Sequence, residues 1–227
     1  MKYPIDFELE FQRHNYPGKL IALEGIDGSG KTTQALELVE SLKKEGIKTV
    51  YTKEPTDGEI GKMIRRILTG EKNFEPVSFQ YLFAADRVEH QEEIIGFLKK
   101  GKIVVSDRYF WSSIPYGATD RGIDFKKSQD EANILLVCYS ILSLYHQFIA
   151  PDITAYLEVS ADAALKRLSA IRHNVDIYDK LEKLKSIARG YEWLIRKFPR
   201  ELTVIDGSKS IDKVSEELFE KVVKITS

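Results

Sequence analysis

Cysteine is almost absent from this sequence, and so is any excess of one charge sign. The single cysteine among 227 residues, Cys138, lies in an apolar stretch. This excludes a disulfide framework and predicts a buried core residue in a reducing, cytoplasmic setting. Lys and Arg number 34 against 35 Asp and Glu. The balance gives no reason to expect a nucleic-acid or membrane partner, so any attraction for phosphate must be local.

Targeting signals and metal-binding histidine patterns are also lacking. Residues 1–6 have no basic flank followed by an apolar stretch, so we expect no secretory signal. The four histidines have no metal-ligand spacing, and we assign them no catalytic role. Residues 132–150 contain no Asp, Glu, Lys or Arg and approach the length of a membrane span. Because Asn133, Ser140 and His146 are among the polar residues that interrupt this stretch, we predict instead a helix buried in the core and in a subunit interface.

The sequence does contain a complete phosphate-loop motif between an apolar run and a helical pattern. The pattern GxxxxGK[ST] is filled by Gly25, Ile26, Asp27, Gly28, Ser29, Gly30, Lys31 and Thr32. Glycines at a strand-to-helix turn let successive N–H groups surround a polyphosphate, and the helix N-terminus adds partial positive charge. The apolar run at 20–23 and the helical spacing at 33–45 therefore favour a nucleotide site over a glycine-rich turn matched by chance.

Each polar residue of this loop has an expected task. Lys31 is predicted to reach the β- and γ-phosphates of ATP, and the Thr32 hydroxyl is a candidate magnesium ligand. The predicted ATP-binding segment runs from Gly25 to Thr33.

Apolar runs alternate with helical patterns from the phosphate loop to the C-terminus. Strands are predicted at 19–24, 48–52, 102–106, 153–159 and 202–206. Helices are predicted at 31–45, 58–69, 76–100, 128–149, 161–169, 179–198 and 211–224. Strands separated by helices need crossover connections, so we predict one α/β domain over 19–227, with a five-stranded, mainly parallel sheet and helices on both faces. Ligands bind such sheets at the carboxyl ends of the strands.

Residues 1–18 have a different period. Apolar side chains at Ile5, Phe7, Leu9 and Phe11 alternate with acidic ones, which predicts a half-buried strand. We expect this N-terminal extension to be docked on a sheet edge or on the body of the domain.

The third predicted strand leads into Asp107, Arg108 and Tyr109, at the same sheet edge as the phosphate loop. A carboxylate here can hold magnesium, directly or through water, and an arginine can bind phosphate through a bidentate fork. The alternative is a surface ion pair at a strand end. The adjacent phosphate loop favours the metal and phosphate site.

With these motifs the sequence resembles the thymidylate kinases, nucleoside monophosphate kinases that phosphorylate dTMP. The resemblance spans about residues 19–206 and rests on several matching pieces. These are residues 22–34, Glu54-Pro55, Phe83-Ala84-Ala85-Asp86-Arg87, Asp107-Arg108-Tyr109 followed by Ser112, Ser113 and Tyr116, Pro151-Asp152, and Asp179-Lys180-Leu181-Glu182. The resemblance implies a P-loop kinase fold with a basic lid at about 167–180, transfer from ATP to dTMP with Mg²⁺, and a homodimer with its interface helix at about 130–149.

The resemblance also assigns roles in a dTMP site. It implies that Phe83 stacks on thymine, that Arg87 donates hydrogen bonds to the carbonyl edge of the base, and that Tyr116 disfavours a ribose 2′-hydroxyl. Phe83 and Arg87 share a face of the predicted helix, which favours this role over an ordinary core aromatic. The other dTMP-binding candidates are Asp27, Glu54, Pro55, Arg108, Ser112 and Ser113. The two serines are equally plausible as exposed helix caps.

Five charged residues are candidates for catalysis. They are Lys31, Asp27, Arg108, Arg167 and Arg172. By resemblance, Arg108 grips the acceptor phosphate and Asp27 faces the reacting phosphates and their metal. Family members without an arginine in the phosphate loop supply one from the lid. Since Ser29 occupies that loop position, Arg167 and Arg172 are implied, the alternative being solvated lid charges.

Two departures from the family pattern bear on the substrate. Lys53 stands where many members carry arginine, and Gly117 stands where glutamine is common. These changes affect which base the site selects more than they affect the type of reaction. An alternative acceptor is therefore dUMP or another (deoxy)nucleoside monophosphate. A catalytically silent nucleotide-binding paralogue is the alternative from a different functional class.

Overall fold

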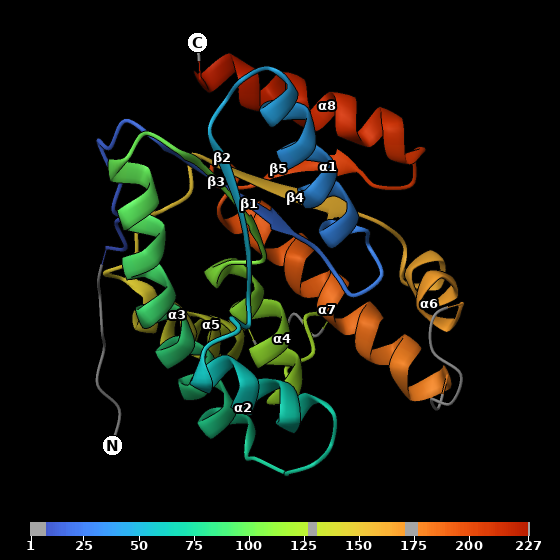
Figure 1. Cartoon of the computed structure of the whole chain (residues 1–227). Coiled ribbons are helices and arrows are strands. Elements are labelled where there is room, and N and C mark those ends of the chain that lie inside the picture. The colour runs from blue at the N-terminus through green and yellow to red at the C-terminus, as the bar shows by residue number, and fades with distance from the viewer. Residues whose placement is uncertain (1–7, 127–130, 171–176, 227) are drawn as a thin grey trace.

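A five-stranded sheet lies at the centre of the structure, a computed structural model that describes residues 8–126, 131–170 and 177–226 (Figure 1). The strands are β1 (Lys19–Glu24), β2 (Thr49–Lys53), β3 (Ile103–Asp107), β4 (Ile153–Glu158) and β5 (Thr203–Asp206). Their order is β2-β3-β1-β4-β5, and every neighbouring pair is parallel. The predicted α/β class and sheet are confirmed. Because β1 pairs with β3, Leu23 lies opposite Asp107 and the two predicted motifs meet at one edge.

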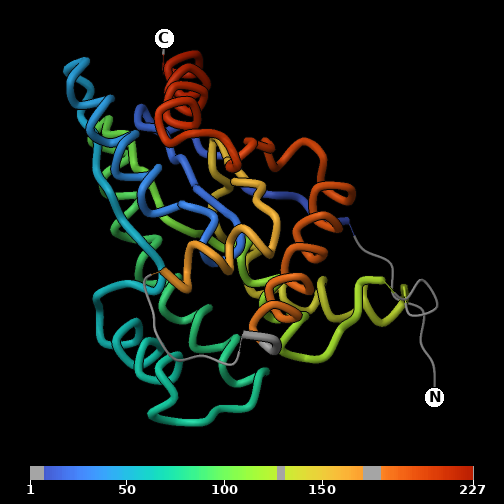
Figure 2. The backbone as a smooth tube through the Cα atoms, turned by 90° about the vertical axis from the view of Figure 1, so that its right-hand side faces the viewer, coloured from blue at the N-terminus to red at the C-terminus, as the bar shows by residue number. Residues whose placement is uncertain are grey.

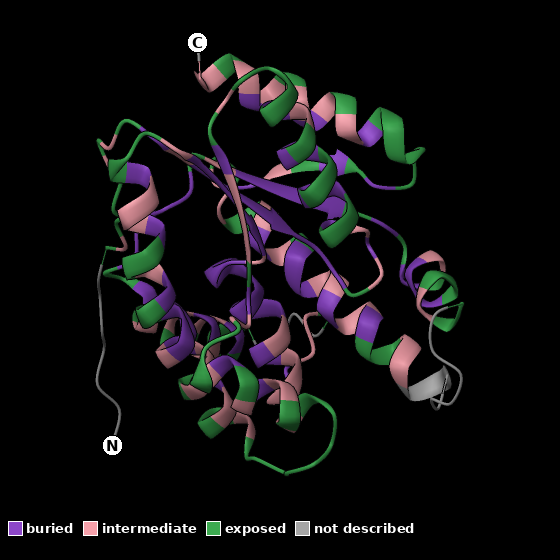
Figure 3. Ribbon diagram, viewed as in Figure 1, coloured by how far each residue is buried: buried purple, intermediate pink, exposed green. Residues whose placement is uncertain are grey.

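Helices cover both faces of this sheet (Figures 1 and 2). They are α1 (Lys31–Lys44), α2 (Glu59–Leu68), α3 (Pro76–Lys99), α4 (Ser113–Asp120), α5 (Glu131–Leu142), α6 (Ala161–Ser169), α7 (Ile177–Lys197) and α8 (Ile211–Thr226). Alternate side chains of β1 point to opposite faces. Ile21 and Leu23 pack with α1 and α8, whereas Leu20 and Ala22 pack with the larger cluster formed by α3, α4, α5 and α7. Accordingly, the strands are largely buried and the outer faces of α1 and α8 are exposed (Figure 3).

The segment after β3 contains helical structure that the sequence patterns did not predict. A 3₁₀ turn at Phe110–Ser112 (η1) leads directly into α4. Both are almost wholly buried, so they lack the one-sided apolar pattern by which an amphipathic helix is recognised.

The helix predicted at 128–149 is shorter than expected. α5 ends at Leu142 and a 3₁₀ turn, Ser143–Tyr145 (η3), follows it, while residues 128–130 lie outside the described ranges. The hydroxyls of Ser140 and Ser143 donate to the carbonyls of Val137 and Ser140, which competes with regular helix. Within the part of the chain described, no helix has the length and apolar character that crossing a membrane requires.

The N-terminal segment 8–18 lies against the core without forming a regular strand. Its one ladder contact is an isolated bridge between Gln12 and Ile149, and the start of the predicted strand, residues 5–7, lies outside the described ranges. The Phe11 ring packs 5.0 Å from Trp111 and 5.8 Å from Phe198, between ring centroids. Leu9 and Phe11 are half-buried whereas Glu8 and Glu10 are exposed. The alternation therefore identified the inward-facing side chains, although ladder pairing beyond Gln12 is absent from residues 8–18.

Candidate functional site

The phosphate loop lies in the turn between β1 and α1. Gly28 and Gly30 have φ angles of 82° and 99°, in the left-handed region that favours glycine. A Cβ atom on Gly28 would lie 2.4 Å from the Ala164 carbonyl oxygen, so α6 requires a glycine there as well. The Lys31 ammonium donates hydrogen bonds to the carbonyls of Gly25 and Ile26, at 3.0 and 2.9 Å, and thus lies inside its own loop.

Lys31 is electrostatically unusual. Its side chain is buried, and desolvation together with the nearby positive charge of Arg108 lowers its pKa to about 7. The carboxylates of Asp27 and Asp107 act in the opposite direction without reversing the shift. An anion placed in the loop would favour the charged ammonium. The charge of this lysine therefore depends on whether an anion lies in the loop.

Thr32 and Asp107 bring two oxygen ligands together beside the loop. The Thr32 hydroxyl, on the first turn of α1, donates a hydrogen bond to the Asp107 carboxylate at the end of β3. Hydroxyl and carboxylate oxygens suit Mg²⁺, which is usually held by one or two protein groups and completed by water and substrate phosphates. Within the described ranges, no cluster of three or more His, Cys, Asp or Glu residues could hold a metal by itself. The two residues therefore fit a magnesium ion that arrives with a nucleotide.

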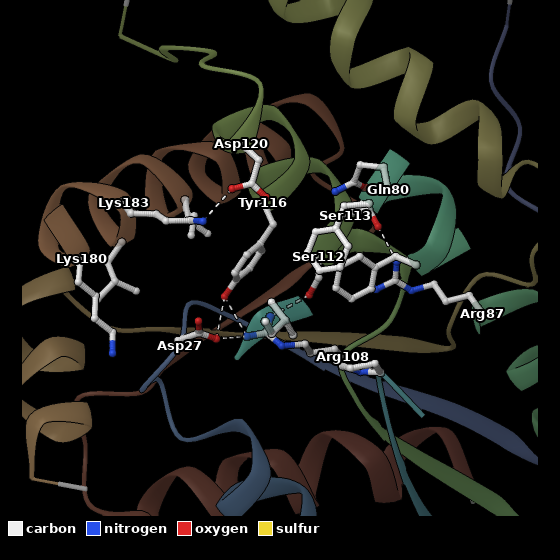
Figure 4. Close-up of a pocket in the computed structure, with 16 residues that line it drawn as sticks. Asp27, Gln80, Arg87, Arg108, Ser112, Ser113, Tyr116, Asp120, Lys180 and Lys183 are labelled. Atoms are coloured by element: carbon white, nitrogen blue, oxygen red, sulfur yellow. Dashed lines mark hydrogen bonds and ion pairs between the residues drawn. The ribbon is translucent and has the colours of Figure 1, made fainter. Parts of the chain in front are cut away.

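Arg108 lies at the centre of the site. Its guanidinium donates to Asp27 and to the Tyr116 hydroxyl, the latter at 2.8 Å, and it lies 4.8 Å from the centroid of the Tyr116 ring (Figure 4). Its backbone has a φ of 76°, an uncommon conformation for a residue other than glycine. Burial acts to raise the pKa of Asp27, but the charges of Arg108 and Lys31 outweigh it, so this pKa lies below its ordinary value. An ionised Asp27 is therefore maintained opposite two cations.

A buried carboxylate, Glu24, positions this arginine. It accepts hydrogen bonds from the backbone N–H groups of Tyr109 and Ser112, at 3.0 and 3.2 Å, and from the hydroxyls of Ser112 and Tyr191. Desolvation raises the pKa of Glu24, although these hydrogen bonds oppose the shift. Through these contacts Glu24 fixes the segment after β3 on which Arg108 is carried.

A cavity of about 280 Å³ opens beside Arg108 and extends between α3, α4 and α7. Phe83 and Arg87 line it from α3, with the Arg87 guanidinium 5.5 Å from the centroid of the Phe83 ring. Arg87 also donates to the hydroxyls of Ser113 and Tyr145. The cavity therefore offers a flat apolar face and a fixed cation next to each other.

Most predicted dTMP-binding residues line this cavity. They are Asp27, Pro55, Phe83, Arg87, Arg108, Ser112, Ser113 and Tyr116. Glu54 does not line it. The Glu54 carboxylate lies behind Arg87, accepts a hydrogen bond from its guanidinium and contacts His90 at 3.0 Å, so it holds Arg87 in place. The two serines are buried rather than exposed, and their hydroxyls bond within the site instead of capping a helix.

Of the two arginines predicted for the lid, only Arg167 lies within the described residues. Arg167, on α6, donates to the carbonyls of Ser29 and Gly207, at 3.3 and 3.0 Å, and so lies against the phosphate loop. Arg172 and the middle of the predicted lid, residues 171–176, lie outside the described residues.

Several cavity residues were missed by the sequence predictions. They are Leu68, Phe79, Gln80, Asp120, Lys180, Lys183, Leu184 and Ile187. The helical spacing of Gln80, Phe83 and Arg87 was a usable signal for Gln80, since residues three and seven positions apart share a face. On α7, Lys180 belongs to a segment that carried the resemblance but had no assigned role, whereas Lys183, Leu184 and Ile187 offered no signal, because the packing of that helix against α4 brings them to the site.

Comparisons with known proteins agree with this geometry. The sequence model of the family described as thymidylate kinase matches residues 23–218. A "Probable thymidylate kinase" of Methanococcus maripaludis (strain S2 / LL) is 43% identical over 216 residues, covering 90% of this chain and 95% of the relative. A "Probable thymidylate kinase" of Pyrococcus horikoshii is 36% identical over 208 residues, covering 88% and 94%. A "Thymidylate kinase" of Thermoanaerobacter sp. (strain X514) is 33% identical over 209 residues, covering 91% and 98%.

Proposed function

The chain belongs to the thymidylate kinase family, and from this premise we propose how its site transfers the γ-phosphoryl group of ATP to dTMP, giving ADP and dTDP. The observation that supports this mechanism is the continuity of the site. The phosphate loop and the cavity beneath Phe83 meet at Arg108, which contacts both the Gly25 carbonyl and the cavity residue Tyr116. Two phosphorylated ligands can therefore approach end to end.

The donor is held by the phosphate loop. Backbone N–H groups and the ammonium of Lys31 surround the β- and γ-phosphates, as the N-terminus of α1 favours negative charge. Arg167, which lies against Ser29, adds positive charge on the side of α6. Thr32 and Asp107 would hold the magnesium ion, which supplies neutralisation of the phosphate charge.

The acceptor occupies the cavity. Phe83 stacks on the base and Arg87 donates to its carbonyl edge, while Arg108 holds the 5′-phosphate. Tyr116, beneath the sugar, disfavours a ribose 2′-hydroxyl. An oxygen of that phosphate attacks the γ-phosphorus of ATP as the bond to the β–γ bridging oxygen breaks and ADP leaves. Catalysis then consists of alignment and charge neutralisation, and no covalent protein nucleophile is required. We also propose a cytoplasmic location for this reaction.

A panel of acceptors tests the proposal. In a coupled assay of ADP release, dTMP should be turned over well in preference to dUMP, dCMP, dGMP and AMP. A preference for another monophosphate would identify a different kinase of the same class. ATP binding without ADP release on any acceptor would identify a catalytically silent paralogue.

Phe83→Ala is expected to raise the KM for dTMP by about 10- to 100-fold with a smaller change in kcat, because stacking of a base on an aromatic ring contributes about 1–3 kcal/mol. Initial rates at varied dTMP and saturating ATP measure the effect. Tyr81→Ala removes an exposed aromatic ring of the same helix and should leave both constants unchanged. A loss in kcat with unchanged dTMP affinity would contradict the stacking role.

We propose a homodimer that uses α5. Ile134, Cys138 and Ile141 face the core, whereas Leu136 is 68% exposed on the outer face of this helix. Leu135 and Val137, on either side of it, are partly exposed, and neighbouring apolar side chains at the surface of a mostly uncharged helix favour association with a second copy. Light scattering should give twice the mass of one chain for the wild type and a single-chain mass for Leu136→Asp. Leu36→Asp, at an exposed position of α1, is the matched control. A monomeric wild type would contradict the proposal.

A further inference from the structure

Gln80 is a buried polar residue of the acceptor cavity. It lies on α3, is only 2% exposed and lines the cavity. Its Oε1 atom is buried and has no hydrogen-bond partner among the described residues. Burying an amide oxygen without a hydrogen-bond partner costs stability. A bound ligand that supplies the missing donor would explain why a glutamine occupies this position.

The space that Gln80 occupies is left free by Gly117. A Cβ atom at position 117, on α4, would lie 2.6 Å from both Cδ and Nε2 of Gln80 and 3.0 Å from its Oε1. Any side chain there would therefore displace the Gln80 amide.

The amide lies next to the groups already assigned to the base. Gln80, Phe83 and Arg87 occupy one face of α3, since residues three and seven positions apart lie on the same side of a helix. In Figure 4, Gln80, Ser113 and Arg87 lie on one side of the cavity, whereas Asp27 and Lys180 lie on the other. The amide is thus placed at the base end of the cavity rather than at the phosphate end.

A pyrimidine imide presents a donor, N3–H, between two carbonyl acceptors. Arg87 can only donate, so it serves a carbonyl but cannot accept from N3–H. The carboxylates that line the cavity are engaged elsewhere, Asp27 with Arg108 and Asp120 with Lys183. Gln80 lines the cavity, and its amide oxygen is a buried acceptor that has no partner among the described residues.

We propose that Gln80 is a specificity-determining residue whose amide oxygen accepts the N3–H of the acceptor base, a contact that Gly117 makes possible. The inference rests on the proposed function, because it concerns the base subsite of the same kinase. In this arrangement Gln80 accepts the hydrogen bond from the N3–H of the base, and Arg87 donates to a carbonyl of the base.

A modified ligand tests the contact directly. Binding of dTMP and of N3-methyl-dTMP is measured by calorimetry with the wild type and with Gln80→Met, which keeps the length of the side chain but removes the amide. Gln80→Met is expected to weaken dTMP binding about ten-fold. We define the methyl penalty as the Kd for N3-methyl-dTMP divided by the Kd for dTMP. This ratio should be at least about ten-fold larger in the wild type than in Gln80→Met, because only the wild type loses a hydrogen bond. The melting temperature of Gln80→Met should be no lower than that of the wild type, since the change removes a buried unpaired oxygen.

A second pair of variants tests the role of Gly117. Gly117→Ala should weaken dTMP binding about ten-fold by displacing the amide, and in a Gln80→Ala background it should have less than a two-fold effect. Gly96→Ala, on α3, is the control, because a Cβ atom there meets nothing within 4 Å.

The outcomes separate the inference from the proposed function. Equal methyl penalties in the wild type and Gln80→Met, or equal effects of Gly117→Ala in both backgrounds, would overturn the role of Gln80 while dTMP turnover by the wild type stands. Failure of the wild type to phosphorylate dTMP in the acceptor panel would instead overturn the function on which the inference rests.

Discussion

Lys31→Met is expected to lower kcat by at least about 10³-fold, because it removes the buried ammonium that we propose neutralises the β- and γ-phosphates of ATP. Lys31 now bonds to the carbonyls of Gly25 and Ile26, and it is the only ammonium on the loop segment 25–33. Single-turnover rates at saturating ATP and dTMP measure the loss in the chemical step separately from product release.

The pH dependence of ATP binding provides an independent signature of the same residue. The pKa of Lys31 is lowered to about 7, so at pH 8 this side chain is mostly neutral in the free protein. Binding of the triphosphate favours the ammonium, and up to about one proton should be taken up at pH 8 but much less at pH 6. Calorimetry in buffers of different ionisation enthalpy measures this uptake, which should be absent in Lys31→Met.

The stability of this variant completes the test. An ordinary lysine pKa of 10.5 in the unfolded chain and about 7 in the folded one mean that the unfolded chain binds more protons between these values. The free energy of unfolding of the wild type should therefore rise with pH across this window, and the rise should be smaller in Lys31→Met. Lys62→Ala removes an exposed lysine of α2 and should change neither turnover nor proton uptake. Turnover within ten-fold of the wild type in Lys31→Met would contradict the assigned role.

Arg108→Ala is expected to lower kcat by about 10²- to 10³-fold and to weaken dTMP binding, because this guanidinium joins the two halves of the site. Arg108→Lys keeps the positive charge but loses the planar fork, so it should recover dTMP binding more fully than turnover. Steady-state kinetics with both substrates varied, together with calorimetric dTMP affinity, distinguish the two effects.

The backbone at this position supplies a matched comparison. Arg108 has a φ of 76°, and a left-handed backbone costs a non-glycine residue about 1–2 kcal/mol. Arg108→Gly and Arg108→Ala both lack the guanidinium and should lose the same activity, but the glycine variant should have the higher free energy of unfolding by about 1 kcal/mol. Equal stabilities in denaturant titrations would show that the backbone there carries no strain, and near-normal turnover in either variant would contradict the role of the arginine.

Local patterns predicted most of the fold because they report forces that act along the chain. The apolar run before Gly25 and the helical spacing after Lys31 placed β1 and α1 within one residue of their observed ends. The segment after β3 was not predicted, because η1 and α4 are buried on nearly all sides and carry no helical stripe. The helix at 128–149 was predicted too long, since serine hydroxyls that bond to nearby carbonyls are not visible in its apolar pattern.

By itself, the sequence determined the family, the α/β class, the phosphate loop and which side chains of the N-terminal segment face inward, because motif spacing and hydrophobic period are properties of neighbouring residues. Only the tertiary structure decided that Glu54 holds Arg87 rather than lining the cavity, that Ser112 and Ser113 are buried, and that Gln80 fills the space beside Gly117. These relations join residues 26 to 88 positions apart in the chain, and they arise from the way helices pack on a sheet, which no local pattern records.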